Sequence, residues 1–321
     1  ILISESKLRL VDGIIRSKPL GEHELKGIDA PVHVFQVKGR TNVRSRFEAN
    51  RQHGLATTVG RDEERALLNS RWQRVARGDG QIFVLSGEPG IGKSRLVADL
   101  HDDILGNGSK YIIVQCSAQH SSSALFPFLD TLDRSAGVSD RDRLETRRSK
   151  LLTQVRPIIG PEAAHRLIDY STSVEEEASV GDAASLRRMA FDALAEWLCG
   201  KDDNHPICIF VEDAHWADPS SLELIEQLAN RTLNEPILLV ITHRPTFDAP
   251  WAARHNSTAL SLNRLGKEQS RLIVAAQLEE TDEAIEQTAA IVERAEGVPL
   301  FLEELSRAVR ELKPSAASGV I

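Results

Sequence analysis

The stretch GEPGIGKS, residues 87–94, constrains the fold of this chain more than any other part of the sequence. It directly follows the apolar run Ile82–Leu85, and after it Leu96, Val97 and Leu100 recur at the spacing of one helix face. A glycine-rich turn between a buried strand and a helix presents backbone N–H groups to phosphate oxygens. The stretch therefore predicts a strand, a phosphate-binding loop and a helix, in that order.

The loop matches the pattern G-x-x-x-x-G-K-S, in which each fixed position has a chemical role. The glycines allow the tight turn, the lysine meets the outer phosphates, and the hydroxyl binds a magnesium ion. We therefore expect Lys93 at the phosphates and Ser94 at the metal. The expected nucleotide-binding residues of the loop are Gly87, Glu88, Pro89, Gly90, Ile91, Gly92, Lys93, Ser94 and Arg95.

An acidic pair is the second element of the expected site. Glu212 and Asp213 directly follow the apolar run Ile207–Val211. A magnesium ion that bridges two phosphates needs carboxylate ligands, and an attacking water needs a base. Because two adjacent carboxylates at a buried strand end are costly without a cation, we expect both to be catalytic and metal-binding. Either one can order the magnesium ion while the other orients the water.

The residues after this pair allow structural and functional interpretations. Asp218 stands before Pro219, and an aspartate in that position is best explained as a helix N-cap. His215 either faces the nucleotide or a partner, or packs the turn together with Trp216. We therefore expect a structural role for Asp218. For His215 the sequence does not decide between the two alternatives.

A third element is the stretch LLVITHRP, in which another apolar run ends at Thr242 and is followed by Arg244. In open α/β sheets, ligands lie beyond the carboxyl ends of the strands. We expect Arg244 to act in catalysis by contacting the terminal phosphate, a charge-assisted contact that is lost on hydrolysis. The alternative is a surface arginine before a turn proline.

Strand-like and helix-like patterns alternate after residue 59, and this order predicts an α/β fold with a parallel sheet covered by helices on both faces. Four near-continuous apolar runs read as strands buried on both sides. A largely helical insert, at about residues 120–200, separates the second run from the third, and the C-terminal part is helical. The predicted strands are 81–86, 111–116, 206–211 and 237–242.

The chain is expected to contain several parts in addition to this fold. With 321 residues and 41 % hydrophobic content, the chain can bury a sizeable core. We expect a short α+β remnant, a linker, a nucleotide-binding core, a helical subdomain and a tail. Their expected bounds are 1–39, 40–56, 57–265, 266–313 and 314–321.

The charge and apolar patterns narrow the expected partners. A net charge of −8 argues against nucleic acid as the main partner, because nucleic-acid binding draws on clustered lysine and arginine. The apolar runs are too short to cross a bilayer, so we expect no membrane contact. Three cysteines without CxxC spacing suggest neither disulfides nor zinc, so we expect a cytoplasmic protein.

The three elements in this order resemble the STAND class of P-loop NTPases, within the wider AAA+ group, over roughly residues 57–310. VGRDEE, at 59–64, is similar to that family's opening motif, and GVPLFLEEL, at 297–305, to its Gly-x-Pro element. The resemblance implies ATP and Mg²⁺ as ligands. It also implies that the backbone of Val59, Gly60 and Arg61 lies against the adenine, and that Pro299 lies near the base. The residues alone do not distinguish adenine from guanine.

One departure from the family concerns the acidic pair. Many relatives have aspartate first, whereas here Glu212 comes first. The roles that the resemblance carries over are phosphate and magnesium binding for Lys93 and Ser94, the Walker B pair for Glu212 and Asp213, and a sensor for Arg244. The departure leaves both assignments of the two carboxylates open.

Residues 1–39 carry a second resemblance, to the last stretch of class III adenylate/guanylate cyclase domains. ILISESKLRLVDG and LGEHELKGIDAPVHVFQV look like the closing strand, helix and final hairpin of that fold. That family's metal-binding aspartates and Asn/Arg pair belong upstream of this segment. The resemblance therefore implies an upstream cyclase domain as a partner, and a fragment that is inactive as a cyclase.

From these resemblances we expect an ATP-dependent regulatory switch with slow hydrolysis, coupled to downstream repeat or effector domains and able to assemble on ATP. Three rivals remain: a cyclase whose attached ATPase is dispensable, an AAA+ protein that grips DNA, and a site that holds ATP or ADP without turnover. The intact Lys93, Glu212 and Asp213 weigh against the last.

Overall fold

The computed structural model describes residues 1–11, 13, 15–24, 31–40, 58–106, 108–139, 141–173, 183–200, 205–278 and 282–312. The predicted linker, apart from residue 40, and the predicted tail at 314–321 lie outside these residues. The chain divides into two compact units, Ile1–Thr57 and Thr58–Ile321, and each is described by itself.

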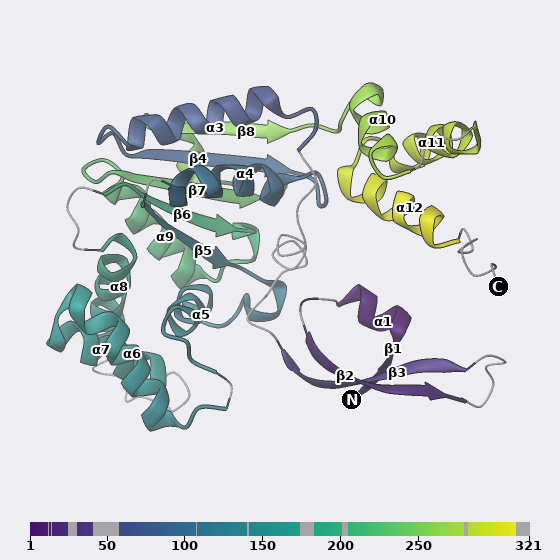
Figure 1. Ribbon diagram of the computed structural model, residues 1–321. Helices are drawn as coiled ribbons and strands as arrows, with labels where there is room; N and C mark the ends of the chain where they lie inside the picture. The colour runs from purple at the N-terminus through teal and green to yellow at the C-terminus, as the bar shows by residue number, and fades with distance from the viewer. Residues whose placement is uncertain are drawn as a thin grey trace. The chain divides into compact units, whose positions relative to one another are not determined.

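The first unit contains a three-stranded antiparallel sheet in the order β1-β3-β2 (Figure 1). Its elements are β1 (Leu2–Ser4), α1 (Glu5–Leu10), β2 (Ile15–His23) and β3 (Val32–Arg40). The resemblance of residues 1–39 implied a strand, a helix and a hairpin, and β1, α1 and the antiparallel pair β2–β3 follow in that order. Most of β2 is exposed, so it contains no apolar run that would mark it as a strand. Two register shifts interrupt its pairing with β3.

The second unit is built on a five-stranded parallel sheet in the order β5-β6-β7-β4-β8. The four predicted strands are confirmed to within one residue at each end. The fifth, β8, was missed because most of its residues are half-buried or exposed and form no apolar run, whereas β5, the other edge strand, does contain one. The strands are β4 (Gln81–Gly87), β5 (Lys110–Gln115), β6 (Ile207–Glu212), β7 (Ile237–His243) and β8 (Ser257–Leu262).

Helices cover both faces of this sheet, as the alternation of patterns predicted (Figure 1). Along β4, Phe83 and Leu85 join one core cluster, while Ile82 and Val84 join the other. The first cluster includes apolar side chains of α3 (Asp62–Val75) and α4 (Lys93–Gly106). The second includes side chains of α5 (Phe126–Ser135), α9 (Pro219–Arg231) and the insert. Both faces of each central strand are therefore buried, which explains the continuous apolar runs.

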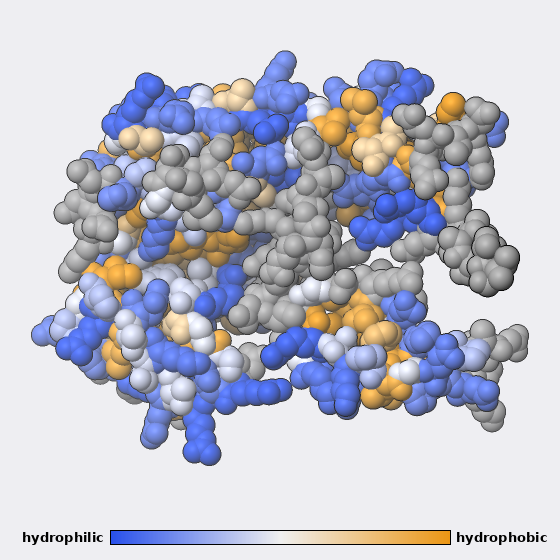
Figure 2. Space-filling model, in the orientation of Figure 1, coloured by the Kyte–Doolittle hydropathy of each residue, from blue (hydrophilic) through white to orange (hydrophobic). Residues whose placement is uncertain are grey.

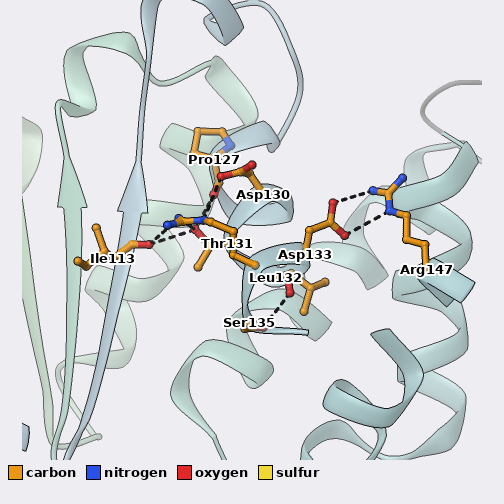
Figure 3. Close-up of polar contacts among 9 residues, drawn as sticks. Ile113, Pro127, Asp130, Thr131, Leu132, Asp133, Ser135 and Arg147 are labelled. Carbon is orange, nitrogen blue, oxygen red and sulfur yellow. Dashed lines mark hydrogen bonds and ion pairs between the residues drawn. The ribbon is translucent and has the colours of Figure 1, made fainter. Parts of the chain in front are cut away.

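The predicted insert between the second and third strands is largely helical in its described residues, as expected. After α5 it contains α6 (Leu144–Ile159), α7 (Pro161–Ser173) and α8 (Ala183–Cys199). Figure 3 shows how α5 is fixed to its neighbours: the Thr131 hydroxyl donates to the carbonyl of Ile113 in β5 at 3.2 Å. On the other side, Arg147 of α6 makes two bonds to the Asp133 carboxylate, at 3.0 and 3.2 Å.

The C-terminal helices are α10 (Lys267–Ala275), α11 (Asp282–Ala295) and α12 (Pro299–Leu312), which share a small core cluster of their own. Figure 2 shows apolar surface over these helices, and three large apolar side chains there are more than half exposed. They are Leu272, Ile285 and Phe301. Within the described ranges, no helix is both long enough and apolar enough to cross a membrane.

Candidate nucleotide-binding site

The glycine-rich loop joins the last residue of β4, Gly87, to the first residue of α4, Lys93. Its turn depends on positive φ angles at Gly90 (76°) and Gly92 (101°), which side chains other than glycine rarely adopt. Gly87 is needed for a steric reason, because a Cβ at this position would lie 2.8 Å from the Ile91 side chain. The glycines of the motif are thus required by the backbone itself.

Lys93 is buried, with 8 % of its surface exposed, and its ammonium group folds back over the loop. Its Nζ donates to the carbonyl oxygens of Gly87 at 2.9 Å and Glu88 at 3.1 Å. Burial lowers the pKa of Lys93, and the charges of Asp213 and Glu212 act in the opposite direction. Lys93 is therefore held at the loop within the electrostatic reach of both carboxylates.

Ser94 connects the loop to the acidic pair. Its Oγ donates a hydrogen bond to Oε1 of Glu212, at the last position of β6. Glu212 is buried, with 6 % exposure. Two motifs that stand 118 positions apart in the sequence thus meet at one hydrogen bond.

Asp213 faces a different environment from Glu212. Its backbone is left-handed (φ 56°, ψ 46°), and its N–H donates to the hydroxyl of Thr242 in β7 at 3.0 Å. Its side chain is 38 % exposed. The left-handed turn therefore separates the two adjacent carboxylates, one directed to Ser94 in the interior and one accessible to solvent.

Arg244 follows β7, which pairs with β4 so that His243 lies opposite Ser86. The carboxyl ends of these parallel strands meet at one edge of the sheet. The Arg244 guanidinium lies 5.3 Å from the centre of the Trp216 ring, and its charge lowers the pKa of Lys93. The structure therefore brings Arg244 to the same edge as Lys93.

His215 is buried beside this charge cluster, with 9 % of its side chain exposed. Its Nδ1 lies 3.9 Å from Oδ1 of Asp213, too far for a hydrogen bond, and its ring lies 5.0 Å from that of Trp216. Neither ring nitrogen has a hydrogen-bond partner among the residues that the structure describes. Burial lowers the pKa of His215, the Asp213 charge raises it, and Arg244 and Lys93 lower it further.

Asp218 has the structural role that the sequence predicted. It is the N-cap of α9, and its Oδ1 accepts from the backbone N–H groups of Ser220 at 2.9 Å and Ser221 at 3.1 Å. The same oxygen accepts from the N–H of Leu125 at 3.3 Å, where the backbone is left-handed. Asp218 therefore also fixes the segment that leads into α5.

The opening motif lies against the loop and the C-terminal helices. The guanidinium of Arg61 is buried and donates to the carbonyl oxygens of Asn263 at 2.5 Å and Ile91 at 3.4 Å. Gly60 has a positive φ of 69°, and a Cβ there would lie 2.4 Å from Cγ of Gln269 in α10. The segment 59–61, expected at the adenine, is thus fixed between the loop and α10.

The Gly-x-Pro element meets the loop from the other side. Pro299 begins α12, and the N–H of the next residue, Leu300, donates to the carbonyl of Gly90 at 3.2 Å. Gly297 has a φ of 77°, and a Cβ there would lie 2.3 Å from the carbonyl oxygen of Leu265. The element therefore brings the start of α12 onto the phosphate-binding loop.

Two ion pairs between the loop region and the C-terminal part were missed in the sequence. Arg264 pairs with Glu88 at 3.1 Å and also with Glu296. Arg95, expected at the nucleotide, forms an ion pair with Glu303 of α12. The members of this second pair are 208 positions apart, so no local pattern could join them.

The parallel sheet, the glycine-rich loop between β4 and α4, and the carboxylates at the end of β6 define a P-loop NTPase fold, so the predicted fold class is confirmed. The chain belongs to the AAA ATPase domain family, whose model matches residues 57–241, more than half of its length.

Among individual proteins, an uncharacterized protein of Rhizobium meliloti (strain 1021), R02095, is 29 % identical over 315 residues. This match covers 97 % of the chain and 30 % of the relative, so the chain spans less than a third of that protein.

Two solved structures are similar at low identity. A RuvB variant of Thermotoga maritima is 13 % identical, over 79 % of this chain and 63 % of that one, with a TM-score of 0.42. A Pyrococcus horikoshii signal transduction ATPase with numerous domains (STAND), with a tetratricopeptide repeat sensor, is 12 % identical. That match covers 83 % of this chain and 31 % of the other, with a TM-score of 0.41.

Proposed function

We propose that the second unit binds Mg-ATP and hydrolyses it slowly, and that the nucleotide state controls how the C-terminal helices dock. One observation carries this proposal: the Ser94 hydroxyl meets the Glu212 carboxylate, directly beside the buried Lys93. A hydroxyl, a carboxylate and an ammonium group at one sheet edge form the donor set that a magnesium triphosphate requires.

The residues present fit a magnesium ion. Mg²⁺ keeps several waters and takes one or two carboxylates together with phosphate oxygens, so it needs no dedicated protein cage. Ser94 and Glu212 are the residues that would hold it. When bound, the ion neutralises charge on the phosphates. Burial of Glu212 at the end of β6 fixes its position for this role.

The two carboxylates are assigned different roles. Glu212 is bonded to Ser94 and belongs to the metal side, while Asp213 is turned toward solvent by its left-handed backbone. Since an attacking water must be reached from solvent, we assign its orientation to Asp213. This assignment selects one of the two alternatives that the sequence left open.

The cationic groups fit the outer phosphates. Lys93 donates to two loop carbonyls, and phosphate oxygens are stronger acceptors that would replace them. Arg244 lies close enough for its charge to act on Lys93, and it would contact the terminal phosphate. Loss of that phosphate removes a charge-assisted contact, which makes Arg244 a sensor.

Three contacts support coupling to the C-terminal helices. The Leu300 N–H bonds to Gly90, Arg264 pairs with Glu88, and Arg95 pairs with Glu303. All three join the phosphate-binding loop or the start of α4 to the segment after β8. A phosphate that rearranges the loop would therefore change how α12 docks.

The place of this switch in a larger protein is part of the proposal. The cyclase resemblance of residues 1–39 and the order strand, helix, hairpin in the first unit support a switch linked to an upstream cyclase domain. Downstream effector domains and assembly on ATP extend the same proposal. The long relative, of which this chain covers 30 %, is consistent with a multidomain setting.

Calorimetric titration with ATP, in the presence of Mg²⁺ and again in a chelator, tests the site. Lys93→Ala should weaken Mg-ATP binding about ten-fold or more, the worth of one charge-assisted hydrogen bond. Glu212→Gln should weaken binding with Mg²⁺ and leave binding in the chelator unchanged. Lys150→Ala is the matched control, because Lys150 pairs with Asp142 in the insert. Equal binding by wild type and Lys93→Ala would refute the proposed site.

A further inference from the structure

His215 is a buried polar side chain whose two ring nitrogens have no hydrogen-bond partner in the part of the chain that the structure describes. Its side chain is 9 % exposed, and within the described ranges both Nδ1 and Nε2 are buried without a hydrogen-bond partner. Most buried polar side-chain atoms in proteins do have a partner. A buried group without one costs free energy that an apolar ring of the same shape would avoid. Packing alone therefore does not explain a histidine here.

The surroundings of His215 point to the nucleotide site. It lies two positions after Asp213, in the short 3₁₀ turn 214–216 that follows the left-handed residue. The charges of Asp213, Arg244 and Lys93 all act on its imidazole. These are the groups assigned above to the water, the terminal phosphate and the loop, so the ring lies where the reaction would occur.

The separation between His215 and Asp213 suggests what the ring does. Nδ1 is 3.9 Å from Oδ1 of Asp213, which is about 1 Å longer than an N–H···O hydrogen bond. Catalytic hydrogen bonds are often long in the absence of ligand and tighten when the substrate binds. Asp213 is 38 % exposed, so its side chain is not held by close packing on all sides.

We propose that His215 is a positioning residue for ATP hydrolysis: with Mg-ATP bound, its Nδ1–H donates to the Asp213 carboxylate and holds that carboxylate toward the attacking water. This inference rests on the proposed function, because it needs Asp213 as the residue that orients the water. His215 acts through Asp213 and does not itself need to touch the nucleotide.

Three substitutions separate this role from packing. His215→Phe keeps a flat ring and removes both nitrogens. His215→Asn places an amide N–H near the position of Nδ1, and His215→Gln places one near Nε2. Each variant is measured for kcat and KM with Mg-ATP, for calorimetric affinity toward Mg-ATP, and for the midpoint of thermal unfolding without nucleotide.

The inference predicts that His215→Phe lowers kcat about 10- to 100-fold, the worth of one hydrogen bond to a charged group, with little change in affinity. Its thermal midpoint without nucleotide should equal or exceed that of wild type, because an unpartnered buried group has been removed. His215→Asn should recover most of the kcat, and His215→Gln should not. In an Asp213→Asn background, His215→Phe should have no further effect.

Several outcomes would overturn the inference. An unchanged kcat in His215→Phe points to packing, and so does a lower thermal midpoint without rescue by His215→Asn. A His215→Phe substitution that lowers the residual kcat of Asp213→Asn as much as it lowers that of wild type would show that His215 does not act through Asp213. If wild type binds Mg-ATP but forms no ADP, hydrolysis fails and the inference fails with it. If wild type forms ADP and the His215 variants have the same kcat as wild type, the proposed function survives and this inference alone is wrong.

Discussion

The two sides of the phosphate-binding loop differ in how they are held. On the inner side, toward the sheet, Lys93, Ser94 and Glu212 are buried or half-buried and joined by hydrogen bonds at strand and helix ends. On the outer side, toward the C-terminal helices, Glu88 and Arg264 are about half exposed, and Arg95 and Glu303 are less so.

This difference separates chemistry from coupling. Buried charges near fixed backbone act at full strength, because little water screens them. Exposed ion pairs are worth little and are weakened by salt, so they can break and re-form without unfolding the domain. The inner side therefore suits catalysis, and the outer side suits a contact that changes with nucleotide state.

The largest expected effect is at Asp213, the solvent-accessible carboxylate that directly follows the buried Glu212 of the inner side. Asp213→Asn should lower kcat about 100- to 10,000-fold, the range for a lost general base, while Mg-ATP affinity changes little. Steady-state ADP formation and calorimetric titration measure the two quantities. Glu212→Gln is the comparison, because it should lose Mg²⁺-dependent affinity. If the two variants exchange these behaviours, our assignment of the carboxylates is reversed.

The second prediction concerns the backbone that brings α12 to the loop. Gly297→Ala should destabilise the fold by about 2 kcal/mol, because the residue has a φ of 77° and a Cβ would meet the carbonyl of Leu265 at 2.3 Å. Gly137→Ala is the matched control, since Gly137 has a φ of 65° and open space around it. Urea unfolding compares them, and equal losses would show that the close contact contributes nothing.

A smaller effect is expected at the half-buried outer pair. Glu303→Gln removes the partner of Arg95 and should speed amide hydrogen exchange in α12 about five-fold, which corresponds to about 1 kcal/mol. Glu304→Gln changes the next residue of the same helix and removes an exposed pair with Arg307 within α12, so it is the comparison. If both variants exchange at the same rate, the pair does not hold α12.

The smallest effect is expected at Arg264, which is the most exposed of these cations. Arg264→Gln should speed exchange in α12 at low salt by less than Glu303→Gln does. The difference from wild type should vanish in about 1 M salt, where charges are screened within a few ångströms. An effect that persists in high salt would place Arg264 among the structural residues.

The fold was largely predictable because the sheet is buried on both faces. The apolar runs of β4, β6 and β7 carry that burial in nearly all their residues, and the run of the edge strand β5 carries it in Ile112 and Val114. The other edge strand, β8, has no such run, since most of its residues are exposed or half-buried. Strand β2 has no apolar run either, because most of its residues are exposed, and only the resemblance to a closing hairpin implied it.

The site was predictable where chemistry is local in the sequence. Two parts of the site can be recognised from residue types at the end of an apolar run: the loop Gly87 to Ser94, and the pair Glu212 and Asp213. The partner of Arg95 and the partners of Arg264 cannot, because they depend on how distant segments dock. Among the described residues His215 has no hydrogen-bond partner, which is likewise a property of the folded turn, and the sequence leaves its role undecided.

The most direct test of the central claim is the formation of ADP from Mg-ATP, followed by chromatography, for wild type and for Lys93→Ala under the same conditions. Our account predicts slow ADP formation that needs both Lys93 and Mg²⁺. If ATP is recovered unchanged from wild type, or if Lys93→Ala forms ADP at the same rate, the site formed by Lys93, Ser94 and Glu212 does not hydrolyse ATP and the account is contradicted.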